Sequence, residues 1–341
     1  MKNDNFREFI FSIPLRMWEN HLTIGKVGNL EIENIVTRKY SHVAKCVLTG
    51  SRAISKVYVK FYKNNKNLSS EEVLQQVKTD YETLIYYNNK FKESNEFGVV
   101  KPLFFLPDRH VLVTLEASGQ TLSDAISRSC NFLASGEELQ RAMQYSTQAG
   151  AWLRYFQSLE NSQSEFYSID TLVEYMNVRL KILAEDSRRN FDPSYSTKIL
   201  EYIGKNRNSI TTEQLYIKPS HNDFNLGNII VQNERVTALD FAKIKKDVFL
   251  LDVSRIYHQL YLITFKPQYR ITTIKKLQKA LLEGFGMPSA DQLMIFRFLL
   301  IRHILTHLVG ITRFWETGVR ERMYNYWVLN RELKFLNSLL F

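Results

Sequence analysis

The stretch "HNDFNLGN", residues 221–228, decides how the rest of the sequence is interpreted. It places a histidine, an aspartate and an asparagine at offsets of 0, 2 and 7, and an apolar run, "IIV", follows at once. That run predicts a short strand directly after a polar loop. A carboxylate and an amide five residues apart in such a loop are oxygen donors of the kind that hard divalent cations prefer.

These offsets suit the transfer of a phosphoryl group. That chemistry needs a carboxylate to orient the attacking hydroxyl, oxygen ligands for Mg²⁺ and a cation on the nucleotide phosphates. Asp223 can orient the hydroxyl while Asn228 reaches the metal, which is the H-x-D-x-x-x-x-N spacing of a kinase catalytic loop. Asp240, 17 residues beyond Asp223 at the close of a predicted hairpin over 228–241, is expected to be a second metal ligand.

The cation on the phosphates is expected to come from the N-terminal part of the chain. Lys60, in "VYVKFY", projects from a predicted strand. Glu82, 22 residues later and in the middle of a predicted helix, is the acid that we expect to hold it. The periodicity permits this pairing without requiring it.

Outward from these residues, the N-terminal third alternates between strands and one helix. Residues 31–62 predict a three-stranded meander, and residues 98–106 and 110–116 predict two further strands. The helix between them begins near Ser69 and Ser70. Its expected buried stripe consists of Val73, Val77, Leu84 and Tyr87.

Downstream of Gly119 the pattern becomes helical, over 121–130, 136–159 and 168–187, and again from 253 to the end. The predicted fold class is therefore α+β with two lobes. A nucleotide-binding lobe is expected over 1–117, with one helix on an antiparallel sheet. A mostly helical lobe over 118–341 is expected to carry catalysis and substrate binding.

Together these segments resemble the aminoglycoside phosphotransferase family, which has the protein kinase-like fold and includes choline-type and fructosamine-type kinases. The resemblance spans nearly the whole chain and is carried by "VKFY", "DYETL", "VLVTLEASGQTL", "HNDFNLGNIIV" and "ALDFAKIKKDVFLLDVSRI". It implies that Asp223 is the catalytic aspartate and that Asn228 and Asp240 are metal ligands. It also implies that Lys60 and Glu82 anchor the phosphates, and that ATP or GTP with Mg²⁺ is the cofactor.

The resemblance implies supporting roles as well. Asp252 falls where relatives keep an aspartate that braces the catalytic loop, and His221 is expected to support the same loop. Glu116 to Ser118 falls where the nucleotide base would meet the main chain between the lobes.

The sequence departs from the family pattern at two places. Asn222 occupies a position that is usually glycine. No glycine-rich loop precedes Lys60: the segment 38–45, "RKYSHVAK", offers only Ser41 and main-chain amides to the phosphates.

Each of these residues also has an ordinary structural explanation. Lys60 can be a solvated strand lysine, Glu82 an acid on a helix surface, and Asp252 the cap of a helix that starts at Val253. Asp223, Asn228 and Asp240 agree in spacing and in hairpin context, which favours the chemical interpretation.

Composition describes a globular chain of 341 residues with 45% hydrophobic and 23% charged residues. Two cysteines, distant in sequence and without metal-ligand spacing, predict reduced thiols and a cytoplasmic location.

The most apolar segment, 292–311, contains two arginines and two histidines, which favours a buried core helix over a membrane span. An N-terminal amphipathic helix using Phe6, Phe9, Ile10 and Ile13 leaves peripheral membrane contact open.

The acceptor is expected to be a small molecule, because only eleven residues separate Asp240 from Asp252 and leave no room for a long activation segment. Residues 253–341 carry 13 Lys or Arg against 5 Asp or Glu. This positive charge favours a neutral or anionic acceptor such as a sugar, amino sugar, alcohol or lipid-linked saccharide. An aminoglycoside-modifying kinase and an inactive kinase-like binding protein remain alternatives. No motif indicates a nucleic-acid partner, and the oligomeric state is open.

Overall fold

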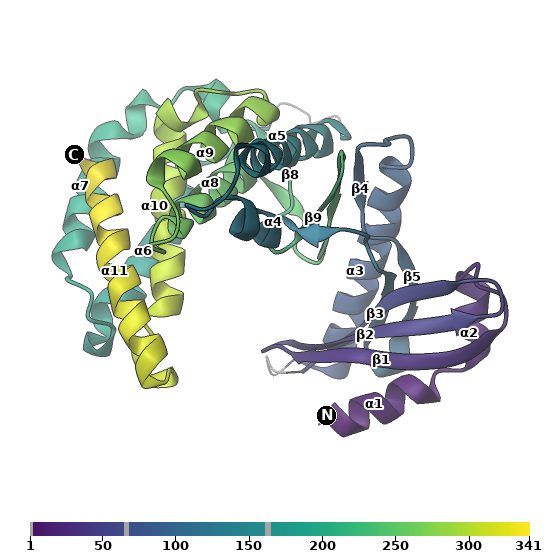
Figure 1. Cartoon of the computed structure of the whole chain (residues 1–341). Helices are drawn as coiled ribbons and strands as arrows, with labels where there is room; N and C mark the ends of the chain where they lie inside the picture. Colours follow the sequence, from purple (N-terminus) through teal and green to yellow (C-terminus); the bar gives the residue numbers. More distant parts are fainter. Residues whose placement is uncertain (1–2, 65–67, 161–164) are drawn as a thin grey trace. The chain divides into compact units, whose positions relative to one another are not determined.

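The computed structural model describes residues 3–64, 68–160 and 165–341. The chain divides into two compact units (Figure 1). Unit 1 comprises Met1–Gln120 with Ile230–Ala242, and unit 2 comprises Thr121–Ile229 with Lys243–Phe341.

This division differs from the expected one, which placed everything beyond residue 117 in the second lobe. Residues 230–242 belong to unit 1 because β10 (Arg235–Ala238) pairs in parallel with β4 (Phe97–Val99). The amide of Val100 also donates to the carbonyl of Ala238. Asp240 is therefore part of unit 1, although Asp223 is part of unit 2.

The main sheet of unit 1 has five strands in the order β1-β2-β3-β6-β5, and all of its pairings are antiparallel. This confirms the predicted meander and the two later strands. Its strands are β1 (Val27–Thr37), β2 (Ser41–Gly50), β3 (Ile54–Tyr62), β5 (Pro102–Leu106) and β6 (Val111–Leu115).

Two short helices, α1 (Asn3–Ser12) and α2 (Leu15–His21), cover one face of this sheet. Phe6 and Ile10 are fully buried, and the ring of Phe6 lies 6.1 Å from that of Phe61. The apolar face of α1 thus belongs to the core of unit 1. It is not the membrane-facing surface that the sequence left open.

Helix α3 (Ser70–Lys90) lies against the other face. It begins with a capping box, in which Ser69 accepts from the amide of Glu72 and the carboxylate of Glu72 accepts from the amide of Ser69. Its buried residues are Val73, Val77, Asp80, Leu84 and Tyr87. The four apolar members are those predicted, and Asp80 is an unpredicted fifth.

A smaller sheet has the order β4-β10-β9-β7, with β9 (Ile229–Gln232) and β7 (Gln120–Thr121). Gly119, just before β7, has φ +122°, and a Cβ there would lie 2.5 Å from the carbonyl oxygen of Val231. Only glycine fits this approach of the two segments.

Unit 2 is mostly helical, as predicted. Its helices are α4 (Leu122–Ser129), α5 (Gly136–Ser158), α6 (Ile169–Glu185), α7 (Ser194–Asn206), α8 (Leu251–Ile263), α9 (Ile271–Phe285), α10 (Met294–Ile311) and α11 (Val319–Leu340). Short 3-10 turns are η1 (Pro107–Arg109) in unit 1 and η2 (Ser187–Arg189), η3 (Arg207–Ser209), η4 (Thr212–Leu215), η5 (Ala290–Gln292) and η6 (Phe314–Glu316) in unit 2.

Helix α10 packs against α6, α8 and α11. By length and composition it is apolar enough to cross a membrane, but 61% of it is buried inside the protein. Arg302 and His303 are among its buried residues. This agrees with the prediction of a core helix.

A two-stranded antiparallel sheet joins β8 (Ile217–Ser220) to β11 (Lys245–Val248). Ser220 faces Lys245 in this register. The pair fixes both ends of the segment that contains residues 221–228, so the loop leaves β8 from a defined position.

Candidate active site

The loop over residues 221–228 belongs to unit 2, and Asp223 lies within it. Two cations contact its carboxylate. Nη1 of Arg255 lies 3.1 Å from Oδ1, and Nζ of Lys243 lies 2.8 Å from Oδ2. These two contacts fix the orientation of the carboxylate. The Asp223 side chain nevertheless remains 22% exposed to solvent.

The loop is folded by its own amide side chains. Nδ2 of Asn228 donates to the main-chain oxygen of Asp223 at 3.0 Å, and Nδ2 of Asn225 donates to the same oxygen at 2.9 Å. Oδ1 of Asn225 accepts from the amides of Gly227 and Asn228. Because the amide nitrogen of Asn228 is used inside the loop, a cation would be bound through its Oδ1.

Asp252, at the start of α8, supports the loop through hydrogen bonds. Its buried carboxylate accepts hydrogen bonds from the hydroxyl of Ser220 at 2.8 Å, the amide of His221 at 2.6 Å and the amide of Asn222 at 3.0 Å. Burial raises the pKa of Asp252 above its usual range, although the charge of His221 and the hydrogen bonds act in the opposite direction. Three consecutive residues before Asp223 are thereby held by one side chain.

His221 is fully buried against Trp152 and Phe224, with ring centroids 6.3 Å and 5.6 Å away. Its main-chain amide, rather than its ring, provides the hydrogen bond to Asp252. Asn222 has φ +57°, in the left-handed region. This explains why glycine is expected at that position and why asparagine, which tolerates this region, can replace it.

In unit 1, Lys60 on β3 lies between two carboxylates. Its Nζ is 2.9 Å from Oδ1 of Asp240 and 3.6 Å from Oδ2 of Asp80. Burial alone would lower the pKa of Lys60, but its interactions with Tyr62, Asp80 and Asp240 outweigh burial and raise it. Lys60 is therefore a fixed cation, not a solvated strand lysine.

The expected pairing of Lys60 with Glu82 is wrong. Glu82 is exposed and lies 3.8 Å from Lys78 on the surface of α3. Positions 80 and 82 are separated by about 200° around a helix, so only one of them can face the sheet. Asp80 faces it, where it also accepts a hydrogen bond from the hydroxyl of Tyr62.

A sequence signal for Asp80 existed. It falls three residues after Val77 and four before Leu84, on the same stripe that the periodicity predicted to be buried. An acid on a buried stripe needs a partner, because burial raises its pKa, as it does for Asp80.

Asp240 follows β10 with φ +62°, an uncommon conformation for a residue other than glycine. The next residue, Phe241, is buried, and its ring lies 5.6 Å from that of Tyr87 on α3. The packed phenylalanine fixes the backbone that presents the Asp240 carboxylate to Lys60. Strained conformations of this kind concentrate at functional sites.

Two of the other predicted nucleotide contacts, Ser41 and Glu116, share the Lys60 face of the sheet. Ser41 opens β2 opposite Tyr62, and its side chain is nearly buried. Glu116 extends β6 and forms an ion pair with Lys45 on β2 at 2.9 Å. Ser118 lies on the short segment between β6 and Gly119.

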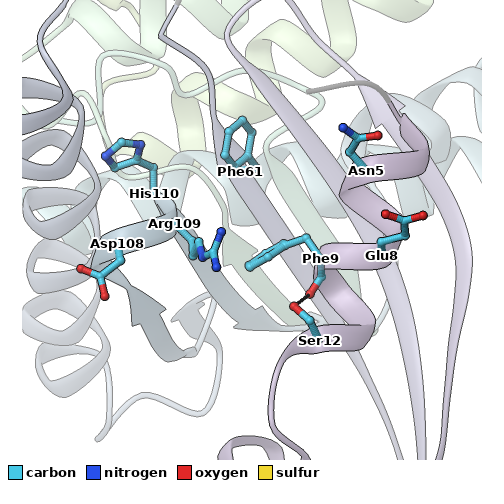
Figure 2. A pocket seen from close by; sticks show the side chains of 8 residues that line it. All are labelled: Asn5, Glu8, Phe9, Ser12, Phe61, Asp108, Arg109 and His110. Carbon is cyan, nitrogen blue, oxygen red and sulfur yellow. Dashed lines mark hydrogen bonds between the residues drawn. The ribbon is translucent and has the colours of Figure 1, made fainter.

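A pocket of about 460 Å³ lies on the opposite face of the same sheet (Figure 2). It is lined by Phe9 of α1, Phe61 of β3 and the turn that contains Arg109 and His110. Phe61 and Lys60 are neighbours on a strand and therefore point to opposite faces. This pocket is not the site formed by Lys60 and Asp240.

Asp240 in unit 1 and Asn228 in unit 2 carry oxygen donors of the type that a magnesium nucleotide uses. Among the residues that the structure describes, no group of three or more His, Cys, Asp or Glu side chains is arranged to hold a metal by itself. Mg²⁺ commonly uses one or two protein oxygens together with water and substrate phosphates. A carboxylate such as Asp240 and an amide oxygen such as that of Asn228 are donors of this type.

Comparison with known proteins establishes the fold. No family model matches the sequence, and no curated protein matches it either. A choline kinase from Cryptosporidium parvum Iowa II aligns with a TM-score of 0.57 over 98% of this chain and 96% of the kinase, at 13% identity. A choline/ethanolamine kinase family protein from Mesorhizobium loti aligns with a TM-score of 0.55 over 100% and 95%, at 13% identity.

An amicoumacin kinase, solved with AMP-PNP, Ca²⁺ and its antibiotic, aligns with a TM-score of 0.53 over 97% of this chain and 96% of the kinase, at 14% identity. Aminoglycoside phosphotransferases are similar to the same degree. The chain therefore has the protein kinase-like fold found in choline kinases and aminoglycoside phosphotransferases, which are small-molecule kinases. This protein kinase-like fold is the one that the sequence predicted.

Proposed function

We propose that this protein is a phosphotransferase that uses ATP or GTP with Mg²⁺ to phosphorylate a hydroxyl group of a small molecule. The observation that carries the proposal is the environment of Asp223, whose carboxylate stands on a loop braced by Asp252 and remains accessible to solvent. The fold, shared with small-molecule kinases, supports the same conclusion.

In this proposal Asp223 orients the acceptor hydroxyl. The hydroxyl oxygen forms a bond to the γ-phosphorus while the bond between that phosphorus and the β–γ bridging oxygen breaks. The hydroxyl proton passes to Asp223, and the products are a phosphate ester and a nucleoside diphosphate. Arg255 and Lys243 hold the carboxylate in its orientation before the acceptor arrives.

Lys60 is assigned to the nucleotide phosphates. Its ammonium is already positioned by Asp80 and Asp240, so little reorganisation is needed when the phosphates bind. Asp240 and Asn228 are assigned as the protein ligands of Mg²⁺, which when bound neutralises charge on the phosphates. Ser41, Glu116 and Ser118 are assigned to the nucleotide because they share the face or the adjoining segment of Lys60. Glu82 has no part in this site.

The acceptor is assigned as neutral or anionic, from the excess of positive charge in residues 253–341. We place the enzyme in the cytoplasm, since Cys46 and Cys130 are both free and buried. Retention of Lys60, Asp223 and Asp240 in defined contacts favours catalysis over a purely binding role.

Nucleotide binding and phosphoryl transfer test the proposal separately. Addition of ATP with Mg²⁺ is expected to raise the melting temperature, and ATP without Mg²⁺ to raise it less. Labelled phosphate is then followed from ATP into amino sugars, sugars, sugar acids, sugar phosphates and choline-like alcohols. A folded protein that neither binds nucleotide nor labels any of these acceptors would contradict the proposal, whereas binding without transfer would favour the binding-protein alternative.

A further inference from the structure

Two arginines from two helices of unit 2 lie against the ring of one tyrosine, and the charge of a third arginine, on another helix, acts on the same tyrosine. The guanidinium carbon of Arg179, on α6, lies 3.3 Å from the ring centroid of Tyr175, and that of Arg302, on α10, lies 4.3 Å from it. Arg255, on α8, is the third, and its Nη1 contacts both the carbonyl of Asn222 at 2.9 Å and Asp223. We call these residues the arginine cluster.

The cluster lacks enough negative charge of its own. Arg302 is only 7% exposed, and its buried Nη1 has no hydrogen-bond partner in the described part of the chain. Neither Arg179 nor Arg302 forms an ion pair within residues 3–64, 68–160 and 165–341. A buried guanidinium without an anion is costly.

Nearby carboxylates are already engaged elsewhere. Asp223 pairs with Arg255 and Lys243, and Asp247 pairs with Lys245 at 2.8 Å. Glu332, on α11, binds His258 and His307. The positive charge of the cluster is thus left for a molecule from outside the chain.

The positive charge of the cluster affects the pKa of two neighbouring groups, Tyr175 and His303. Burial would raise the pKa of Tyr175, but the hydrogen bond with Thr306 and the charges of Arg302, Arg179 and Arg255 lower it below its ordinary value. Burial and the charges of Arg255 and Arg302 hold the pKa of His303 well below its usual range. For Tyr175 the hydrogen bond and the arginine charges outweigh burial, whereas for His303 the arginine charges add to it.

The cluster is open to solvent on one side and is connected to Asp223 on the other. Thr306 is exposed, and its hydroxyl lies 3.2 Å from that of Tyr175, which is half-buried like Arg179. Arg255 joins the cluster to the carboxylate that orients the acceptor hydroxyl. A molecule with its hydroxyl at Asp223 therefore lies beside Arg255, the member of the cluster that contacts this carboxylate.

The geometry points to an acceptor that carries an anionic group, a carboxylate or a phosphate, bound by Arg302, Arg179 and Arg255 beside Tyr175. This inference rests on the proposed function and names its substrate class. Stacking of arginines on tyrosine would explain Arg179 without a ligand, but it leaves the buried Nη1 of Arg302 unexplained. A polycationic acceptor would be repelled at the same place.

Direct binding tests this inference without knowledge of the natural acceptor. The full-length protein, saturated with a non-hydrolysable ATP analogue and Mg²⁺, is titrated calorimetrically with glucose, glucosamine, glucuronate and glucose 6-phosphate. We expect saturable binding of glucuronate or glucose 6-phosphate, and the stronger of the two distinguishes a carboxylate from a phosphate site. Glucose and glucosamine are expected to bind at least about tenfold more weakly, since neither carries an anionic group for the arginines.

Substitution then places the binding on the cluster. Arg302→Met and Arg179→Met are expected to weaken anion binding by about tenfold to a hundredfold, and Arg302→Lys by less. Arg297→Met removes one exposed positive charge from the same helix and is the matched control, with binding unchanged. The affinity for the ATP analogue is expected to stay within about twofold in all four variants, because Lys60 and Asp240 are untouched.

Three outcomes would overturn the inference. Absence of anion binding by the wild type, equal binding by Arg302→Met and wild type, or preference for glucosamine over both anions would each do so. Failure of the ATP analogue to bind would instead count against the proposed function. The anion titration can be repeated without nucleotide in that case, because the cluster lies within unit 2. Circular dichroism of each variant separates loss of the site from loss of the fold.

Discussion

Lys60 and Asp80 form an ion pair between β3 and the buried stripe of α3, with 3.6 Å between Nζ and Oδ2. The pair joins the sheet to its helix and positions the cation that we propose for the nucleotide phosphates. The acid that pairs with Lys60 is Asp80, two residues before Glu82, which the sequence had predicted.

The first prediction contrasts these two acids. Asp80→Asn is expected to lower kcat/KM for the nucleotide by about tenfold to a hundredfold, because Lys60 loses a charged partner and is no longer held in place. Glu82→Gln is the matched control and is expected to leave kcat/KM unchanged. Steady-state kinetics with varied nucleotide concentration decides it, and a larger effect at Glu82 than at Asp80 would contradict the assignment.

The second prediction separates Asp223 from Asp240. Asp223→Asn is expected to keep the affinity for ATP and Mg²⁺ while turnover falls by about two to four orders of magnitude, because its carboxylate acts in the transition state. Asp240→Asn is expected to weaken metal-dependent nucleotide binding as well, since a neutral amide replaces a charged ligand.

Calorimetric titration of both variants with ATP, with and without Mg²⁺, measures this difference. Circular dichroism first establishes that each variant is folded. If Asp223→Asn is as active as wild type on an acceptor that the wild type phosphorylates, Asp223 is not the catalytic residue.

The third prediction concerns Asp252. Asp252→Ala removes the acceptor of three hydrogen bonds and leaves the donors of Ser220, His221 and Asn222 buried without it. We expect a loss of about 2–5 kcal/mol in the free energy of unfolding. Ser220→Ala removes only one of the three bonds and is expected to cost about 1 kcal/mol. Urea unfolding compares the two, and equal losses would show that the main-chain bonds contribute little.

The fourth prediction follows from Glu332, which is fully buried on α11 between His258 at 3.1 Å and His307 at 2.7 Å, with the ring of His303 stacked on His258. Burial would raise the pKa of Glu332, but the two histidines outweigh it and lower the pKa from 4.5 to about 2. A pKa that is lower in the folded state contributes stability above the unfolded pKa, and this stability is lost as the pH falls from 4.5 toward 2.

Glu332→Gln is therefore expected to be less stable than wild type at pH 6 by on the order of 3 kcal/mol, with the difference shrinking as the pH falls below 4.5. Urea unfolding at a series of pH values measures it. A difference that stays constant down to pH 3 would indicate that the charge of Glu332 is not what stabilises the fold.

The sequence predicted the helices and strands well, but it predicted less well which side chains pair across them. Strands and helices follow from local periodicity, and the loop around Asp223 follows from residues at most seven positions apart. Asp80 was missed because only apolar residues were counted in the stripe of α3. The arginine cluster joins residues 179, 255 and 302, and no local pattern connects positions on three separate helices.

The ion pair between Lys45 and Glu116 bears on inhibitor design. Lys45 lies opposite Tyr58, which is two residues from Lys60 on β3, so Lys45 and Lys60 share one face of the sheet. Lys45 also forms an ion pair with Glu33 at 3.0 Å. If the purine binds beside Glu116 as we propose, a flat apolar compound that imitates it would meet two charges there and would have to desolvate them. Compounds that carry a hydrogen-bond acceptor for Lys45 and a donor for Glu116 are the better starting point for selective inhibition.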